Sequence, residues 1–299
     1  MSAAPLPADA VAAALRPFGD SRMLPGAAYT SADVLAWERR HLFAGSWTCV
    51  GRVAELRAGA THRALSVGDI GVLLTFDESV HAFANVCRHR GHELLSTLEP
   101  SERRAIVCPY HGWSYTLDGR IHAAPRMGPD FPAGQYGLVP LPAAEWHGWL
   151  FVNASAAAPP FAEHLGSLGD LVDVYRPGAL TVRARHSYEV AANWKLIVEN
   201  YHECYHCPQI HPELCAVTPP NSGENWHSDA AWVGGSMELR EHAVTMSLDG
   251  ASRGFPLPDV DPRVVRYLGL FPNLLLSLHP DYVLTHRLEP LAPDRTLVE

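Results

Sequence analysis

Two short motifs that each combine a cysteine with a histidine place the strongest constraint on how this chain can fold. They are Cys87-Arg88-His89 and Cys108-Pro109-Tyr110-His111, and eighteen residues separate them. Each motif offers one thiolate and one imidazole, so the two together can ligate two metal ions. A fold that uses them must bring the two segments side by side.

Two simpler interpretations compete, a structural zinc site of Cys₂His₂ type and buried cysteines beside unrelated histidines. Zinc sites favour two residues between paired cysteines and a longer spacing between paired histidines, and neither is present here. The residues after each pair, Arg90-Gly91-His92 and Gly112-Trp113-Ser114-Tyr115, complete a pattern that resembles the Rieske domain of ring-hydroxylating oxygenases. The ligand loops of that domain lie at hairpin tips, where glycine allows the backbone to approach a cluster closely.

The resemblance implies a [2Fe–2S] cluster in which Cys87 and Cys108 bind one iron while His89 and His111 bind the other. Neutral imidazoles in place of anionic thiolates make such a cluster easier to reduce. Trp113 is expected to shield it from water.

A second group of donors lies in residues 193–214, where Glu203 and His206 stand three positions apart and would share one face of a helix. His211 follows five positions after His206, a poor spacing for a regular helix, but Pro208 must disturb the helix between them. Two histidines and a carboxylate with open positions are typical of Fe(II) oxygenases. Surface histidines near a helix end are the simpler alternative.

This segment is similar to the catalytic-domain signature of Rieske oxygenase α subunits, and that likeness implies that His206 and His211 are iron ligands. It also implies that Glu203 joins His206, through hydrogen bonds, to His111 of a neighbouring subunit in a homotrimer. A carboxylate between two imidazoles can accept a hydrogen bond from each and fix their tautomers. Cys204, Cys207 and Cys215 could form a disulfide or a further metal site, but we expect Cys204 and Cys207 to pack in the core or along the helix and assign no role to them.

The third iron ligand of the family is an aspartate that usually falls later in the chain than residue 299. Asp281 and Asp294 are available carboxylates, but nothing near either favours it. Residues 296–299 read as the inside of a strand. We therefore expect a truncated form whose iron site is incomplete as given.

Three segments are expected, namely a helical N-terminal extension over 1–46, a Rieske domain over 47–154 and a catalytic domain over 155–299. Helix is predicted over 26–47, capped by Thr30, and again from Trp194 to His206. Hairpins are predicted at Asp77-Glu78-Ser79 and at Asp118-Gly119. The resulting fold class is α+β, with an all-β Rieske domain and a catalytic domain of helix-grip type, in which helices lie on an antiparallel sheet.

Composition narrows the possible partners. The formal charge of −9 argues against nucleic acid, which needs clustered lysine and arginine. No apolar stretch is long enough to span a membrane and no secretory signal is evident, so a reducing, cytoplasmic location is expected. Because the sequence has no Gly-x-Gly-x-x-Gly fingerprint, electrons from NAD(P)H should come through a separate reductase, with or without a ferredoxin.

The implied activity is that of the oxygenase component of a Rieske non-haem iron oxygenase, which uses O₂ to hydroxylate, dihydroxylate or demethylate a small molecule. The stretch from Glu199 to Leu214 and residues 271–277 look like the branch that acts on quaternary ammonium compounds, although an aromatic substrate fits the family equally. Trp226, Trp232 and Tyr267 are candidates for a cation-binding cage, although they could equally belong to the core or to the wall of a pocket for an aromatic ring. A Rieske electron carrier and a catalytically inactive homologue are the alternatives.

Overall fold

The computed structural model describes residues 3–17, 19–96 and 101–299 and shows two compact units. One unit joins residues 1–38 to residues 159–299, and the other spans residues 39–158. The chain thus leaves the first unit after its N-terminal helices and returns to it near the Ala- and Pro-rich stretch at 155–160. Each unit is described separately below.

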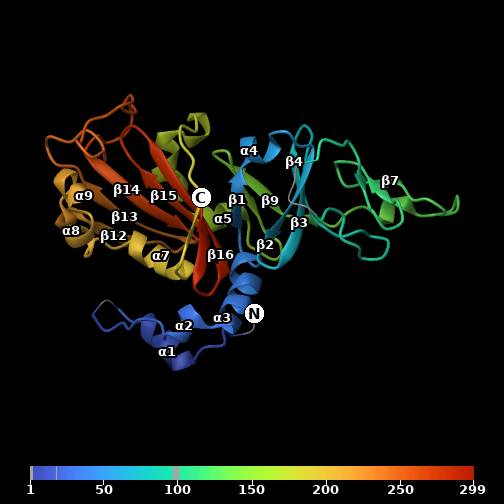
Figure 1. Cartoon of the computed structure of the whole chain (residues 1–299), viewed down its shortest axis with the longest axis horizontal. Coiled ribbons are helices and arrows are strands. Elements are labelled where there is room, and N and C mark those ends of the chain that lie inside the picture. The colour runs from blue at the N-terminus through green and yellow to red at the C-terminus, as the bar shows by residue number, and fades with distance from the viewer. Residues whose placement is uncertain (1–2, 18, 97–100) are drawn as a thin grey trace. The chain divides into compact units, whose positions relative to one another are not determined.

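The unit of residues 39–158 is built from short antiparallel strands in three small sheets (Figure 1). Their orders are β1-β10-β9, β2-β3-β4-β8 and β5-β6-β7. The strands are β1 (Thr48–Arg52), β2 (His62–Val67), β3 (Ile70–Phe76), β4 (Val80–Ala84), β5 (Ile106–Val107), β6 (Ser114–Tyr115), β7 (Ile121–Ala123), β8 (Pro140–Leu141), β9 (Ala143–Trp146) and β10 (Trp149–Val152). A short helix, α4 (Val53–Arg57), follows β1.

Both predicted hairpins are confirmed. Strand β3 pairs antiparallel with β4 across the turn at residues 77–79, and Asp77 Oδ1 accepts a hydrogen bond from the amide of Ser79 at 2.9 Å. Strand β6 pairs with β7 across Asp118-Gly119. Gly119 has φ +81°, a left-handed conformation that a side chain would strain, and a Cβ there would lie 2.5 Å from the ring of Phe83.

The unit of residues 1–38 and 159–299 contains a seven-stranded antiparallel sheet in the order β11-β17-β16-β15-β14-β13-β12. The apolar run from Val264 to Leu278 forms two of its strands, because a turn at 271–273 divides it. The strands are β11 (Tyr188–Val190), β12 (Glu224–His227), β13 (Trp232–Glu238), β14 (Val264–Leu270), β15 (Leu274–Leu278), β16 (Val283–Ala292) and β17 (Arg295–Val298).

The helices of the described residues are short, and none is long and apolar enough to cross a membrane. The predicted helix over 26–47 is wrong in its continuity and its cap. It is divided at Ser31, whose hydroxyl, rather than that of Thr30, accepts the amide of Val34 at 3.4 Å. The helices are α1 (Ala8–Ala14), α2 (Ala27–Thr30), α3 (Ala32–Glu38), a π-helical turn (Arg39–Phe43), α5 (Phe161–Leu165), α6 (Leu168–Val172), α7 (Trp194–Tyr201), α8 (Cys207–Ile210) and α9 (Pro212–Val217).

Helix α7 lies on one face of the seven-stranded sheet, beside β16, and supports the second group of donors (Figure 1). Asn193 caps its N-terminus, because the Asn193 side chain accepts the amide of Lys195 at 3.1 Å. Its apolar face, Ile197, Val198 and Tyr201, packs against the buried core of β15, β16 and β17. A helix held on an antiparallel sheet confirms the predicted α+β class.

Helices α2 and α3 fix α7 from its other side through polar contacts. The buried carboxylate of Glu38 accepts hydrogen bonds from Lys195 Nζ at 2.6 Å and from Trp194 Nε1 at 2.9 Å. The hydroxyl of Tyr29 donates to Glu199 Oε1 at 2.7 Å. Two residues near the start of α7 and one near its end are therefore anchored to the N-terminal segment.

Candidate active site

The two Cys-His motifs form two loops with the same hydrogen-bond pattern. In the first loop, the amide of Cys87 donates to the carbonyl of His92 at 2.7 Å, and the amide of Gly91 donates to the carbonyl of Cys87 at 3.0 Å. The loop of Cys108 repeats both bonds, at 2.7 and 3.1 Å. The glycine of each loop has a positive φ, +69° and +73°, which explains why glycine occupies this position in both.

The four predicted cluster donors come together from these two loops. The thiols of Cys87 and Cys108 are buried and contact each other, and burial raises the pKa of the Cys108 thiol. The ring of His111 is exposed and that of His89 is partly exposed, and their centroids lie 4.8 Å apart. Trp113 is buried and its ring stacks on that of His89 at 4.7 Å, in line with its expected role as a shield.

Tyr115 holds the first thiol from inside the unit. Its hydroxyl lies 3.2 Å from Cys87 Sγ and accepts the amide of Arg88 at 3.0 Å. Burial raises the pKa of Tyr115, which therefore keeps its proton and can donate it to the sulfur. A hydrogen bond to a cluster sulfur is one way in which a protein adjusts the reduction potential of a cluster.

The four donors fall into two pairs of the kinds that a two-iron cluster uses. Cys87 and Cys108 give a buried thiol pair, whereas the partly exposed His89 and the exposed His111 give an imidazole pair. Within the part of the chain that the structure describes, no group of three or more His, Cys, Asp and Glu side chains is arranged to hold one metal ion. A cluster with two irons needs two ligands for each, and these pairs would provide them.

In the other unit the donors do not share a helix, so the predicted helix from Trp194 to His206 is wrong over its second half. Helix α7 ends at Tyr201, and α8 begins at Cys207 with Pro208 in its first turn. Proline suits the start of a helix because its missing amide would have no partner there. Pro208 therefore starts a new helix, and the residues between α7 and α8 form a turn.

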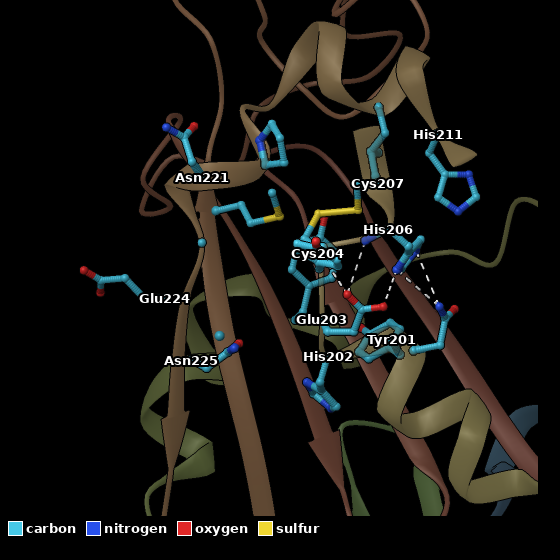
Figure 2. Close-up of a pocket in the computed structure, with 18 of the residues that line it drawn as sticks. Tyr201, His202, Glu203, Cys204, His206, Cys207, His211, Asn221, Glu224 and Asn225 are labelled. Atoms are coloured by element: carbon cyan, nitrogen blue, oxygen red, sulfur yellow. Dashed lines mark hydrogen bonds and ion pairs between the residues drawn. A yellow bond between two sulfur atoms is a disulfide. The ribbon is translucent and has the colours of Figure 1, made fainter. Parts of the chain in front are cut away.

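Glu203 organises this turn through its carboxylate. It accepts the amides of Tyr205 and His206 at 2.6 and 3.4 Å, and its Oε1 lies 2.5 Å from Nδ1 of the His206 ring (Figure 2). Although burial opposes ionisation, the hydrogen bonds from His206 and Tyr205 hold the pKa of Glu203 below its usual value. A carboxylate in contact with an imidazole fixes the ring orientation and its tautomer.

The turn brings the imidazoles of His206 and His211 together, with ring centroids 5.4 Å apart. The side-chain amide nitrogen of Asn200, near the end of α7, lies 3.3 Å from His206 Nδ1. The His206 ring is therefore in contact with both Glu203 and Asn200. Asp281 is engaged elsewhere, because its carboxylate accepts hydrogen bonds from Thr245 and from Ser252. The two rings fit a shared ferrous ion, to which they would contribute two neutral nitrogen ligands.

A pocket opens over these side chains between α7, α8 and strands β12, β13 and β14 (Figure 2). Its walls contain Glu203, His206 and His211. Of the three rings proposed for a cation cage, Tyr267 lines the pocket, whereas Trp226 and Trp232 are not among the described residues around it. The three rings therefore do not form one cage around this pocket, and Trp232 lies in the core, which was the alternative.

His202, the residue after the end of α7, is a further wall residue of the pocket. Burial lowers the pKa of its imidazole to about 4, so the ring is neutral near pH 7. Its Nε2 is buried without a hydrogen-bond partner among the described residues. Gly269 makes room for it, because a Cβ at 269 would lie 2.6 Å from that nitrogen.

Comparison with known protein families assigns both units. Residues 46–142 match the Rieske [2Fe-2S] domain, and residues 177–299 match the catalytic domain of the ring hydroxylating alpha subunit. The glycine betaine monooxygenase oxygenase subunit of Chromohalobacter salexigens is 33% identical over 97% of this chain and 73% of its own length. The chain belongs to the Rieske non-haem iron oxygenase family.

Other relatives agree. The carnitine monooxygenase oxygenase subunit of Acinetobacter baumannii is 38% identical over 63% of this chain and 52% of its own length. A solved quaternary ammonium Rieske monooxygenase aligns with 92% of this chain and 73% of its own, at a TM-score of 0.71 and 28% identity. Naphthalene 1,2-dioxygenase from Rhodococcus sp. shares the fold at a TM-score of 0.73, over 92% of this chain and 71% of its own, but is only 20% identical.

Membership of the family confirms the predicted class of function and its cofactors. The chain is the oxygenase subunit of a Rieske oxygenase, an oxidoreductase with a [2Fe–2S] domain and a catalytic iron domain. It belongs to a multi-component system in which a reductase supplies the electrons and a small molecule is the substrate.

Proposed function

We propose that this Rieske oxygenase hydroxylates a quaternary ammonium compound at a carbon next to the nitrogen. The observation that carries the proposal is the charge of the pocket. Among its described wall residues, Glu203 and Glu224 are acidic and none is lysine or arginine. Such a pocket attracts a cation, and the relatives named above carry names that refer to glycine betaine, carnitine and quaternary ammonium.

Aromatic walls add to this preference. Tyr201 and Tyr267 stand nearly perpendicular to each other, with ring centroids 5.8 Å apart, and His202 is perpendicular to Tyr201 at 4.9 Å. The faces of neutral aromatic rings attract an alkylammonium group. Because its pKa is lowered to about 4, His202 adds no positive charge that would repel the substrate near pH 7.

We assign Cys87 and Cys108 to one iron of the cluster, and His89 and His111 to the other. His206 and His211 are assigned as ligands of the catalytic iron. When bound, the cluster delivers electrons one at a time and the ferrous ion activates O₂. The buried thiols would hold the cluster from inside the unit, whereas the partly exposed His89 and the exposed His111 would hold it nearer the surface, where an electron donor or acceptor could approach.

Glu203 is assigned as the carboxylate that links His206 to His111 of a neighbouring subunit in a homotrimer. The exposure of the Glu203 side chain supports the assignment. This side chain contacts His206, yet 45% of it is exposed and could meet another subunit. Tyr205 and Ile210, close to it in sequence, are 96% and 64% exposed. Exposed apolar side chains near a functional carboxylate in the sequence suit contact with another subunit.

The remaining assignments concern organisation and partners. We assign residues 47–154 as the Rieske domain, 155–299 as the catalytic domain and 1–46 as a helical extension. The electrons are proposed to come from NAD(P)H through the reductase, with a ferredoxin where the reductase lacks its own iron–sulfur centre. A cytoplasmic location fits the reduced thiols that the cluster cysteines must present during cluster assembly.

The test is substrate-dependent O₂ uptake by the full chain with a surrogate reductase. Glycine betaine, carnitine and choline are each compared with an uncharged isostere in which a tert-butyl group replaces the trimethylammonium group. We expect uptake and product formation with the ammonium compounds and at least about tenfold lower kcat/KM with the isosteres, as cation–π and charge contacts are lost. Equal rates for both sets, or uptake with aromatic hydrocarbons alone, would refute the substrate class.

A pair of variants at one position separates the ring from its hydroxyl. Tyr267→Phe keeps the aromatic face and should retain the preference for the ammonium compound over its isostere. Tyr267→Leu removes the face and should reduce that preference by roughly three- to tenfold. Because both substitutions keep an apolar side chain of similar burial, a loss of preference in both would mean that Tyr267 does not contact the ammonium group.

A further inference from the structure

Two cysteines border the turn that carries His206. Cys204 and Cys207 form a disulfide, with their Cα atoms 5.1 Å apart, and both line the pocket (Figure 2). The expectation that they would only pack in the core or along a helix is therefore wrong. Cys49, Cys87, Cys108 and Cys215 are not part of a disulfide.

The disulfide closes the same turn that Glu203 closes by hydrogen bonds. The carboxylate of Glu203 binds the amides of Tyr205 and His206 from one side. The crosslink ties the two ends of the turn together, where the amide of Cys207 also donates to the carbonyl of Cys204 at 3.1 Å. Since a short crosslinked loop has few backbone conformations, His206 is restricted by both constraints at once.

The crosslink can be reached by a small reagent. Cys204 is partly exposed at the pocket wall, whereas Cys207 is buried. Thiol–disulfide exchange requires that one sulfur be accessible to an attacking thiolate, and Cys204 meets this condition. Disulfides in a reducing compartment are usually transient or redox-sensing rather than structural.

We propose that Cys204 and Cys207 form a reversible thiol–disulfide couple that controls how firmly His206 is held for iron binding. The inference rests on the proposed role of His206 as an iron ligand. In the reduction, a thiolate of a low-molecular-weight thiol attacks the disulfide, and a second thiolate then resolves the mixed disulfide. The overall change is protein disulfide plus two RSH giving two protein thiols plus RSSR, so the two electrons and two protons balance.

The expected change in iron binding depends on the constraint that remains after reduction, namely the hydrogen bonds of Glu203. After reduction, the turn keeps the hydrogen bonds of Glu203 but loses its crosslink, and the His206 ring samples more orientations. Changes in the residues that orient a metal ligand typically lower metal affinity by about 10- to 100-fold. Because Glu203 stays in place, we expect the lower end, about a tenfold faster loss of the catalytic iron.

The first measurement counts thiols. The full chain is equilibrated in reduced or oxidised glutathione buffer and alkylated after unfolding. The mass of the intact protein is then measured by mass spectrometry, which gives the number of alkyl labels. The oxidised wild type should carry two fewer labels than the reduced wild type, whereas Cys204→Ser should lose this difference. Cys215→Ser, at a free cysteine of α9 outside the pocket wall, is the matched control and should keep it. Equal labelling of the wild type in both buffers overturns the proposal.

The second measurement follows iron. A ferrous chelator is added to the holoenzyme in each buffer, and the release of catalytic iron is timed while the visible absorbance of the cluster serves as an internal reference. Faster release from the reduced wild type, with no buffer dependence in Cys204→Ser, supports the couple. Equal release rates from both states of the wild type overturn its control of His206. Absence of chelatable iron in both states, with the cluster intact, would instead contradict the proposed function of His206 and leave the thiol count to decide on the couple.

Discussion

Removing the carboxylate of Glu38 should destabilise the catalytic unit, because this residue neutralises a buried lysine. The side chains of Glu38 and Lys195 are only 6% and 12% exposed, and their charged atoms lie 2.6 Å apart. The substitution Glu38→Gln keeps an acceptor for Trp194 but leaves the Lys195 ammonium without a counter-ion. Breaking a buried ion pair in this way costs about 3–5 kcal/mol.

The structure favours the low end of that range. The Lys195 ammonium also lies 5.5 Å from the ring centroid of Tyr29 and 5.2 Å from that of Trp194. These two rings offer partial compensation of about 0.5–1 kcal/mol each. We therefore expect a loss of about 3 kcal/mol, which lowers the midpoint of thermal unfolding of a unit of this size by roughly 6–12 °C.

The assay is thermal unfolding followed by tryptophan fluorescence, arranged as a double-mutant cycle. Lys195→Met alone should destabilise about as much as Glu38→Gln, whereas the double variant should recover most of the loss because a neutral pair needs no counter-ion. Arg253→Met, which removes the exposed ion pair with Asp249, is the control and should leave the midpoint unchanged. If the double variant is as unstable as the sum of the single ones, the charge explanation is incorrect.

Three further perturbations address the cluster loops, the substrate pocket and the pH response. Tyr115→Phe removes the hydroxyl 3.2 Å from Cys87 Sγ and should lower the reduction potential of the cluster, measured by redox titration of its visible spectrum; an unchanged potential would mean that the hydroxyl does not donate to the sulfur. Gly269→Ala places a Cβ where His202 Nε2 lies, so it should raise the KM for the substrate while the midpoint of thermal unfolding changes little. A lower midpoint with an unchanged KM would show that Gly269 has a structural role only. Burial lowers the pKa of His279 from 6.5 to about 3, so its contribution to stability is complete above pH 6.5 and declines as the pH falls from 6.5 towards 3, by roughly 2–4 kcal/mol. His279→Phe should shift acid unfolding to lower pH, and an identical acid midpoint would contradict this.

The cluster loops were largely predictable because local chemistry determines them. A cysteine and a histidine that lie close in sequence must project from one short loop, and a glycine after them allows the left-handed turn seen at Gly91 and Gly112. The hairpin at Asp118-Gly119 was predictable for the same reason. In each case the residues that determine the geometry are neighbours in the chain.

The turn at Glu203 was less predictable, because propensity favoured a continuous helix through it. In the structure the Glu203 carboxylate accepts the backbone amides of Tyr205 and His206, so the helix does not continue. Whether these amides bind the carboxylate or the helix backbone depends on where the His206 ring finally lies. The pocket wall shows the same limit. Trp226 and Tyr267 are both aromatic residues on strands, yet only the latter faces the cavity.

By itself, the sequence determined the types of donor, their grouping into two metal-binding segments and the α+β class, since these follow from residue identity and local spacing. The tertiary structure decided which donors meet, how Glu203 and His206 are joined, and that Cys204 bonds to Cys207. It also decided that α7 is anchored by the N-terminal segment through Glu38 and Tyr29. For the anchoring of α7, the physical reason is that contacts between residues more than a hundred positions apart depend on how whole elements pack, which no local pattern encodes. Within the turn of residues 203–207, the side chains compete with a continuous helix for the same backbone groups, and only the packed structure decides that competition.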